Sequence, residues 1–216
     1  MAGCPTRKEH PMSTSDLSNG PLHDDPLEWF GQWLAEAEAT GMSDPNACTV
    51  ATVGPDGQPS ARVVLLKEWD ARGFVFYTNL RSQKGREALR HGCVSMSFFW
   101  RDLGRQVRIE GPVLQVPDAR ADAYFATRAR GSQIGAWASF QSQPLDDRDA
   151  LMRRTRDIEE KYEGEDVPRP RHWSGVLIMP TRFEFWQAGE FRLHDRFAFT
   201  PSLRGDTDWS IARLNP

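Results

Sequence analysis

Residues 49–67 read TVATVGPDGQPSARVVLLK, and their pattern gives the first indication of the fold class. Both halves are rich in β-branched and apolar residues, and Pro55-Asp56-Gly57 separates them, a pattern that predicts an antiparallel hairpin. Later segments repeat the strand pattern with hairpin-like links and without βαβ alternation. We therefore expect a mainly β protein, an antiparallel barrel with helices packed outside it. The later strands are predicted at 73–78, 94–100, 106–116, 175–179, 182–187, 192–199 and 209–214.

Four helices are predicted around these strands. For the first, Asp25 is the capping residue, Pro26 suits the first position, Glu28 completes a capping box, and Gly41 ends the helix. The other three are predicted from about Ser82 to residue 90, from Asp118 to residue 128, and from Asp147 to residue 162.

The composition of the 216-residue chain limits its class of partner. A net charge of −3, from 27 basic and 30 acidic residues, gives no long-range attraction for nucleic acid or an anionic membrane. Neither a membrane span nor a secretory signal is evident. The three cysteines form no CxxC pair, which argues against a thiolate metal site and favours a reducing cytoplasm. The five histidines have neither HxxxH nor HExxH spacing, so no zinc site is predicted. Residues 1–24 are predicted as a disordered tail, and residues 25–216 as one domain.

The most unusual feature is the sequence RLHDR at residues 192–196. On a regular strand, Arg192, His194 and Arg196 share one face. Such a row is either a solvated outer face with partners on the neighbouring strand, or an anion site. The planar guanidinium group of arginine binds phosphate through two N–H groups, and histidine adds a titratable donor. The spacing alone leaves both interpretations open.

Two further clusters are candidates for anion binding. Tyr124 and Arg128 are four residues apart on a predicted helix and face the same way, with Ser132 soon after. This set is either a monophosphate pocket or a charged helix end that complements the helix dipole. Lys84 lies in the first turn of another predicted helix, where free backbone N–H groups also favour an anion.

The strand at residues 62–67 carries a charge at each end. Arg62 and Lys67 are five apart, so a regular strand directs them to opposite faces. Either the two side chains serve different ligands, or a bulge redirects one of them.

In combination and in order, these segments resemble the pyridoxine/pyridoxamine 5'-phosphate oxidase family, from about Pro26 to Pro216. The most specific motifs are RGSQIGAWAS (130–139) and RLHDRF (192–197). The others are RVVLLK (62–67), GFVFYTN (73–79), SQKGRE (82–87), RQVRIEG (105–111), QSQP (141–144) and EFWQ (184–187).

The resemblance implies an FMN-binding split barrel that forms a homodimer, with FMN at the subunit interface. It implies an enzyme of vitamin B6 metabolism, a pyridoxal 5'-phosphate synthase. Such an enzyme oxidises pyridoxine 5'-phosphate and pyridoxamine 5'-phosphate with O2 as acceptor and releases H2O2. Arg192 and His194 would be catalytic. FMN contacts would be Arg62, Val63, Val64, Leu65, Leu66, Lys67, Tyr77, Thr78, Gln83, Lys84, Gln106, Gln141, Ser142, Trp186 and Arg196. Substrate contacts would be Lys67, Tyr124, Arg128, Ser132, Arg192, Leu193 and His194.

One departure at the flavin site and two alternatives accompany this resemblance. Gln83 stands where many relatives have Arg, so one contact to the flavin phosphate is either lost or made by Gln. A related flavin oxidase would act on another ring, such as a phenazine precursor. The retained set of Lys67, Tyr124, Arg128 and Ser132 argues against it, because a phosphate-free substrate has no use for that set. A non-catalytic flavin or pyridoxal-phosphate carrier would be expected to lack one of the two catalytic residues, and both are present.

Overall fold

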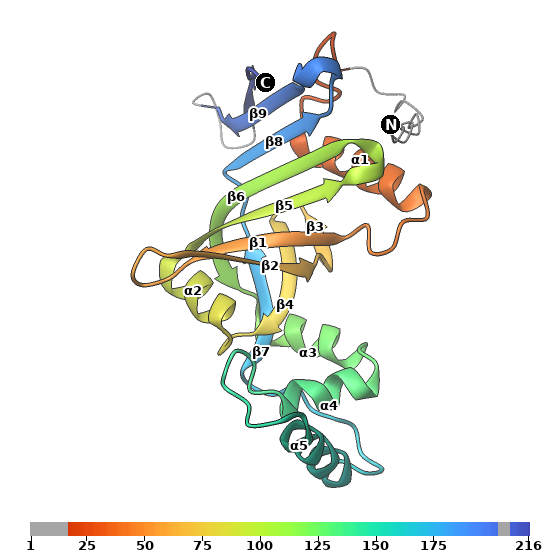
Figure 1. Ribbon diagram of the computed structural model, residues 1–216, viewed down its shortest axis with the longest axis vertical. Helices are drawn as coiled ribbons and strands as arrows, with labels where there is room; N and C mark the ends of the chain where they lie inside the picture. Colours follow the sequence, from red (N-terminus) through yellow and green to blue (C-terminus); the bar gives the residue numbers. More distant parts are fainter. Residues whose placement is uncertain (1–16, 203–207) are drawn as a thin grey trace, which may run out of the picture. The chain divides into compact units, whose positions relative to one another are not determined.

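The computed structural model describes residues 17–202 and 208–216, which contain five α-helices and ten strands (Figure 1). The strand order is β10-β9-β8-β6-β5-β1-β2, while β4 pairs with β3 and β7, and β7 also pairs with β6. The helices are α1 (Pro26–Ala39), α2 (Gln83–His91), α3 (Asp118–Ala126), α4 (Arg130–Ala138) and α5 (Arg148–Lys161). The strands are β1 (Ala47–Val53), β2 (Pro59–Leu65), β3 (Glu68–Asp70), β4 (Gly73–Asn79), β5 (Cys93–Trp100), β6 (Arg105–Gln115), β7 (Trp173–Ile178), β8 (Arg182–Gln187), β9 (Asp195–Pro201) and β10 (Trp209–Arg213).

The chain divides into two compact units, each made of separate stretches of sequence. Unit 1 comprises residues 1–48, 97–109 and 181–216, and unit 2 comprises residues 49–96 and 110–180. Unit 1 therefore holds α1 and the strands β8 to β10. Unit 2 holds α2 to α5 and the strands β2, β3, β4 and β7. The single domain predicted over residues 25–216 stays a prediction.

In unit 1, α1 packs its aromatic residues against the strands. Trp29 is fully buried and stacks on Phe185 of β8, with ring centroids 4.2 Å apart and an interplanar angle of 6°. Trp33, one turn further along α1, meets the same ring edge-on. Asp25 caps the helix as predicted, since its side chain accepts a hydrogen bond from the Leu27 N–H. These contacts place α1 over β8 and leave the helix little freedom to move.

Ordered structure in unit 1 begins before the end of the predicted tail. Leu17 is fully buried, and its carbonyl oxygen accepts a hydrogen bond of 2.7 Å from Arg213 Nη2. The same nitrogen donates to the carbonyl of Ser18 at 2.9 Å. Residues 17 and 18 therefore make contacts with the C-terminal strand, while the tail predicted over residues 1–24 stays a prediction. Residues 1–16 lie outside the described part of the chain.

The strand predicted to begin at Arg192 begins instead at Asp195. A single 3-10 turn covers Glu190–Arg192, and Phe191 and Arg192 have φ values of 54° and 65°. The Leu193 N–H donates to the Glu190 carbonyl at 2.9 Å, so a local hydrogen bond closes this turn. The predicted alternation of side chains is therefore wrong for Arg192 and His194, and only Arg196 lies on a strand.

In unit 2, the buried strand β4 pairs with β7 in antiparallel register, with Tyr77 opposite Gly175. A Cβ on Gly175 would lie 2.9 Å from the Tyr77 ring, so the glycine makes room for that ring. Helix α2 follows β4 and is capped by Ser82, as predicted. Helix α4 is missing from the sequence-based prediction because its N-cap, Ala129, makes no side-chain capping bond. It is held by packing, since Ile134 joins a buried cluster.

Candidate active site

Unit 2 contains a cavity of about 860 Å³. Residues of β2, β4, α2, α3 and α4 line it, together with residues that follow α4. Leu66 does not line the cavity, because its side chain is buried elsewhere. The predicted site residues in its wall are Arg62, Val63, Val64, Leu65, Lys67, Tyr77, Thr78, Gln83, Lys84, Tyr124, Arg128, Ser132, Gln141 and Ser142. The wall residues that the sequence did not single out are Ser60, Ala61, Asn79, Gly135, Ala136, Ser139 and Trp173.

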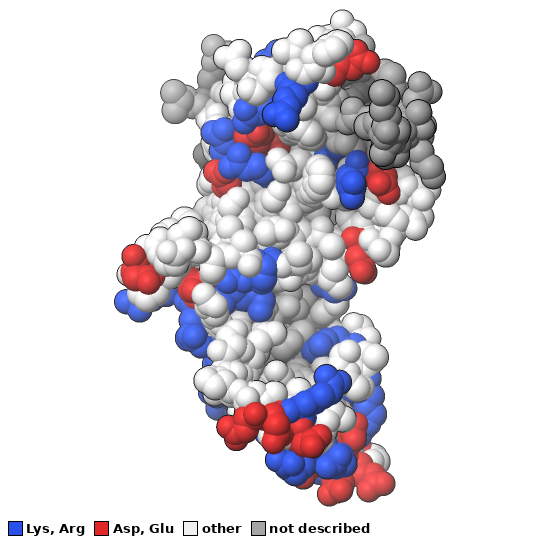
Figure 2. All heavy atoms as spheres, viewed as in Figure 1, with Lys and Arg blue, Asp and Glu red and all other residues white. Residues whose placement is uncertain are grey.

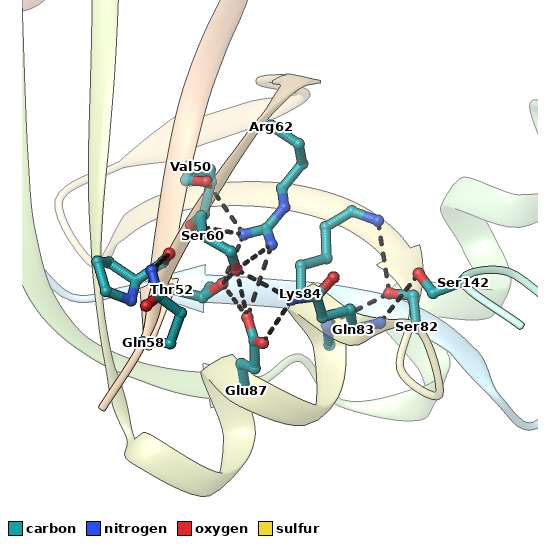
Figure 3. A network of polar contacts seen from close by, with 12 residues as sticks. Val50, Thr52, Gln58, Ser60, Arg62, Ser82, Gln83, Lys84, Glu87 and Ser142 are labelled. Carbon is teal, nitrogen blue, oxygen red and sulfur yellow. Dashed lines mark hydrogen bonds and ion pairs between the residues drawn. The ribbon is translucent and has the colours of Figure 1, made fainter. Parts of the chain in front are cut away.

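One end of the cavity is basic and lies at the start of α2 (Figure 3). Lys84 Nζ donates to Gln141 Oε1 at 3.0 Å, and the Gln83 N–H donates to Ser142 Oγ at 3.1 Å. The pKa of Lys84 is lowered by burial and by repulsion from Arg62. An anion placed here would relieve that repulsion and would restore the pKa of the lysine.

The Arg62 side chain lies beside Lys84 and belongs to a dense polar network (Figure 3). Its Nη1 donates to Thr52 Oγ1 at 2.5 Å, and its Nη2 donates to Ser60 Oγ at 2.6 Å. The Glu87 carboxylate lies 3.6 Å from Nη2. Burial raises the pKa of Glu87, but hydrogen bonds from its neighbours and the charge of Arg62 outweigh this effect and bring the pKa to about 2.

Three aromatic rings form another part of the wall. Tyr77 stacks on Tyr124 with ring centroids 4.0 Å apart, and on Trp173 with centroids 5.2 Å apart. The Tyr77 hydroxyl donates to Glu68 Oε1 at 2.5 Å. Burial and this hydrogen bond raise the pKa of Tyr77, so the hydroxyl stays protonated at neutral pH. The stack fixes the Tyr124 ring in the cavity wall.

Arg128 is a wall residue with a buried nitrogen that lacks a hydrogen bond among the described residues. Its guanidinium carbon lies 4.6 Å from the centre of the Trp173 ring. Its Nη1 is buried and has no hydrogen-bond partner among the described residues. Burial lowers the pKa of Arg128. Because a buried charged donor without a partner is costly, this arrangement fits an anionic ligand, and Tyr124 and Ser132 supply hydroxyls in the same wall.

The other predicted site residues belong to unit 1. Arg196 donates to Glu184 Oε1 from Nε at 3.0 Å and from Nη2 at 2.7 Å, and Nη1 donates to the Asn215 carbonyl at 2.9 Å. The Trp186 and His194 rings are 4.7 Å apart. The motif EFWQ includes the buried Glu184, but the sequence pattern assigned this residue no role, because strand residues between aromatic neighbours resemble ordinary core positions. Arg192 and Leu193 are exposed, and Gln106 is half-buried.

The fold and the cavity define a class of protein: an antiparallel β protein with a small-molecule site suited to phosphate-bearing ligands. A family model described as pyridoxamine 5'-phosphate oxidase matches residues 34–162. A second, described as the pyridoxine 5'-phosphate oxidase C-terminal dimerisation region, matches residues 173–216. The chain belongs to the pyridoxamine 5'-phosphate oxidase family.

Individual relatives agree with this assignment. A pyridoxine/pyridoxamine 5'-phosphate oxidase of Myxococcus xanthus (strain DK1622) is 56% identical over 192 residues, which cover 89% of this chain and 92% of the relative. One from Azorhizobium caulinodans is 49% identical over 216 residues and covers all of both chains. The solved structure of PhzG from Burkholderia lata 383, in complex with tetrahydrophenazine-1-carboxylic acid, matches with a TM-score of 0.83 and 32% identity, covering 90% of this chain and 94% of that one. This likeness confirms the predicted split-barrel fold. None of the helices in the described part of the chain has the length and apolar character needed to cross a bilayer.

Proposed function

We propose that the protein is an FMN-dependent oxidase that converts pyridoxine 5'-phosphate and pyridoxamine 5'-phosphate into pyridoxal 5'-phosphate. The observation that carries this proposal is Arg128, a half-buried residue whose Nη1 is buried and has no hydrogen-bond partner among the described residues. Its cavity wall also holds Tyr124 and Ser132. These residues form a site for a phosphate monoester. Membership of the family and the names of relatives about half identical to this chain support the same reaction.

Bound FMN would supply the redox chemistry, a two-electron oxidation at the C4' carbon with O2 as the final acceptor. The alcohol substrate and O2 then give pyridoxal 5'-phosphate and H2O2. The amine substrate consumes a water molecule as well and gives ammonia as a third product. The protein's own task is to hold two ring systems and to neutralise two phosphates.

The basic end of the cavity would hold the FMN phosphate. The residues present fit this group, because Lys84 has a depressed pKa beside Arg62 and lies at the start of α2, next to Gln83 and Ser142. The remaining proposed flavin contacts are Val63, Val64, Leu65, Leu66, Lys67, Tyr77, Thr78, Gln106, Gln141, Trp186 and Arg196.

The substrate would use the other cationic set. Lys67, Tyr124, Arg128 and Ser132 would bind its phosphate. Arg192, Leu193 and His194 would cover the pyridine ring, where Arg192 and His194 would orient C4' and stabilise developing charge.

We also propose a homodimer with FMN at the subunit interface. The segment described as a dimerisation region includes the turn at residues 189–194, in which Phe191 is 90% exposed and Leu193 is 69% exposed. Large apolar side chains with such exposure favour contact with another chain. We also propose a cytoplasmic location, which is supported by three cysteines that lie far apart in the sequence and form no CxxC pair.

The visible spectrum of the purified protein tests the proposal. We expect a yellow protein, or a colourless one that becomes yellow on addition of FMN. Pyridoxamine 5'-phosphate added without air should bleach the flavin, and air should restore the colour with one H2O2 per aldehyde formed. A protein that takes up no FMN would contradict the proposal. Bleaching by a phenazine precursor, but not by either phosphorylated substrate, would favour the related oxidase.

A further inference from the structure

Glu87 is a nearly buried acid on α2 that the proposed reaction does not use. Its Oε2 accepts hydrogen bonds from Thr52 Oγ1 at 2.5 Å and from Ser60 Oγ at 2.8 Å. Its Oε1 accepts a hydrogen bond from Gln83 Nε2 at 2.8 Å. Glu87 itself is not a lining residue of the cavity, and its carboxylate points towards Thr52, Ser60 and Arg62 (Figure 3).

The side chains that Glu87 holds are themselves cavity residues. Ser60 and Gln83 line the cavity, as does Arg62, whose Nη2 lies 3.6 Å from the carboxylate. When the Ser60 hydroxyl donates to Glu87, its lone pairs remain free to accept from Arg62 Nη2 at 2.6 Å and from Gln83 Nε2 at 3.3 Å. One carboxylate therefore orders the hydroxyl, the guanidinium and the amide at the basic end of the cavity.

We propose that Glu87 is a positioning residue for the FMN phosphate, which holds Arg62, Ser60 and Gln83 in the geometry that receives this group. The inference rests on the proposed function, because it takes FMN as the ligand of the basic end. Glu87 acts through these neighbours and does not touch the cofactor.

A negative charge near a phosphate site also repels the phosphate, so the two effects of Glu87 have opposite signs. The positioning effect is the larger one. Three hydrogen bonds and the charge of Arg62 already compensate the carboxylate, and its strongly lowered pKa reflects that compensation. Removal of the carboxylate would leave the side chains of Thr52, Ser60 and Gln83 without the acceptor that they share.

The test is FMN binding to the apoprotein, followed by flavin fluorescence, in the variants Glu87→Gln and Glu87→Asp. The first removes the charge at nearly constant shape, and the second keeps the charge but withdraws it by one methylene. Loss of a charge-assisted hydrogen bond weakens binding by about tenfold or more, and we expect this for both variants. Riboflavin, which has no phosphate, should bind the variants and the wild type equally. Arg86→Gln, an exposed change on the same helix, is the matched control.

Three results would overturn the proposal. Tighter FMN binding by Glu87→Gln with unchanged binding by Glu87→Asp would show that only the charge matters. Unchanged FMN affinity in both variants, with a lowered melting temperature, would show a purely structural role. An equal loss of riboflavin and FMN would place the effect away from the phosphate. A wild-type protein that bound no FMN would overturn the proposed function as well, so the two failures are distinguishable.

Discussion

Replacement of Arg128 by Met tests the phosphate site most directly. Met keeps an unbranched apolar stem that can pack on Trp173, but it removes the guanidinium whose Nη1 has no partner. A charge-assisted hydrogen bond contributes about 1.5–3 kcal/mol, and a guanidinium that binds phosphate through two of them contributes at least about 3 kcal/mol. Because Arg128 is already partly desolvated without a ligand, little of this contribution is offset on binding. We therefore expect kcat/KM for pyridoxamine 5'-phosphate to fall by roughly 100-fold.

The assay compares the phosphorylated substrate with unphosphorylated pyridoxamine. If Arg128 binds the phosphate, the variant should lose the 100-fold factor only for the phosphorylated substrate. Arg148→Met is the matched control, since Arg148 is exposed at the start of α5, where charged side chains of both signs gather (Figure 2).

The thermal stability of the apoprotein provides a second measurement. Removal of a partly buried cation whose Nη1 has no hydrogen-bond partner among the described residues should leave the melting temperature unchanged or raise it by a few degrees. An equal loss of kcat/KM for pyridoxamine and for its phosphate would refute the reasoning, as would a large fall in the melting temperature.

Three other changes give separate tests. In Gly189→Ala, the new Cβ would lie 1.9 Å from the Leu193 carbonyl oxygen, so the turn that carries Arg192 must shift. We expect kcat to fall by about tenfold or more while FMN stays bound. An unchanged kcat would contradict the proposed role of this turn. In Gly73→Ala, the Cβ would lie 1.9 Å from the Ile178 carbonyl oxygen, and residue 73 has a φ of 133°. We expect the free energy of unfolding, measured in urea, to fall by at least about 3 kcal/mol. The control Gly131→Ala, in an open part of α4, should leave it unchanged or raise it. The pKa of Glu87 falls from 4.5 to about 2 on folding, so its contribution to stability is fully present above pH 4.5 and is lost as the pH falls towards 2. The difference in unfolding free energy between wild type and Glu87→Gln should therefore shrink over that range. A constant difference would contradict the lowered pKa of Glu87.

The sequence predicted those parts of the fold whose signals are local. Asp25, Ser82 and Asp147 begin their helices as predicted, because a capping side chain bonds to an N–H only two or three residues away. The strand β8 has the predicted limits, 182–187. The motif resemblance also identified the family that the comparisons confirm.

The same local reasoning failed where no local signal exists. Helix α4 has no capping side chain, and its position depends on packing against residues of other elements. The segment at residues 192–194 has the alternation of a strand, but it follows and partly forms a turn in which Phe191 and Arg192 have left-handed backbone conformations. Apolar alternation cannot distinguish these two conformations when the side chains remain exposed.

The family and most of the elements could be read from the sequence, and the sequence also predicted which side chains bind the two phosphates. Only the tertiary structure decided how these side chains are held. The Glu87 carboxylate meets Ser60 and Thr52 from 27 and 35 residues away, and no pattern of spacing predicts such contacts. Likewise, only the folded structure shows that Arg128 lies against Trp173 with its Nη1 buried and without a hydrogen-bond partner among the described residues. The residue types follow from the chain, but their burial and their partners depend on segments that meet only in the folded protein.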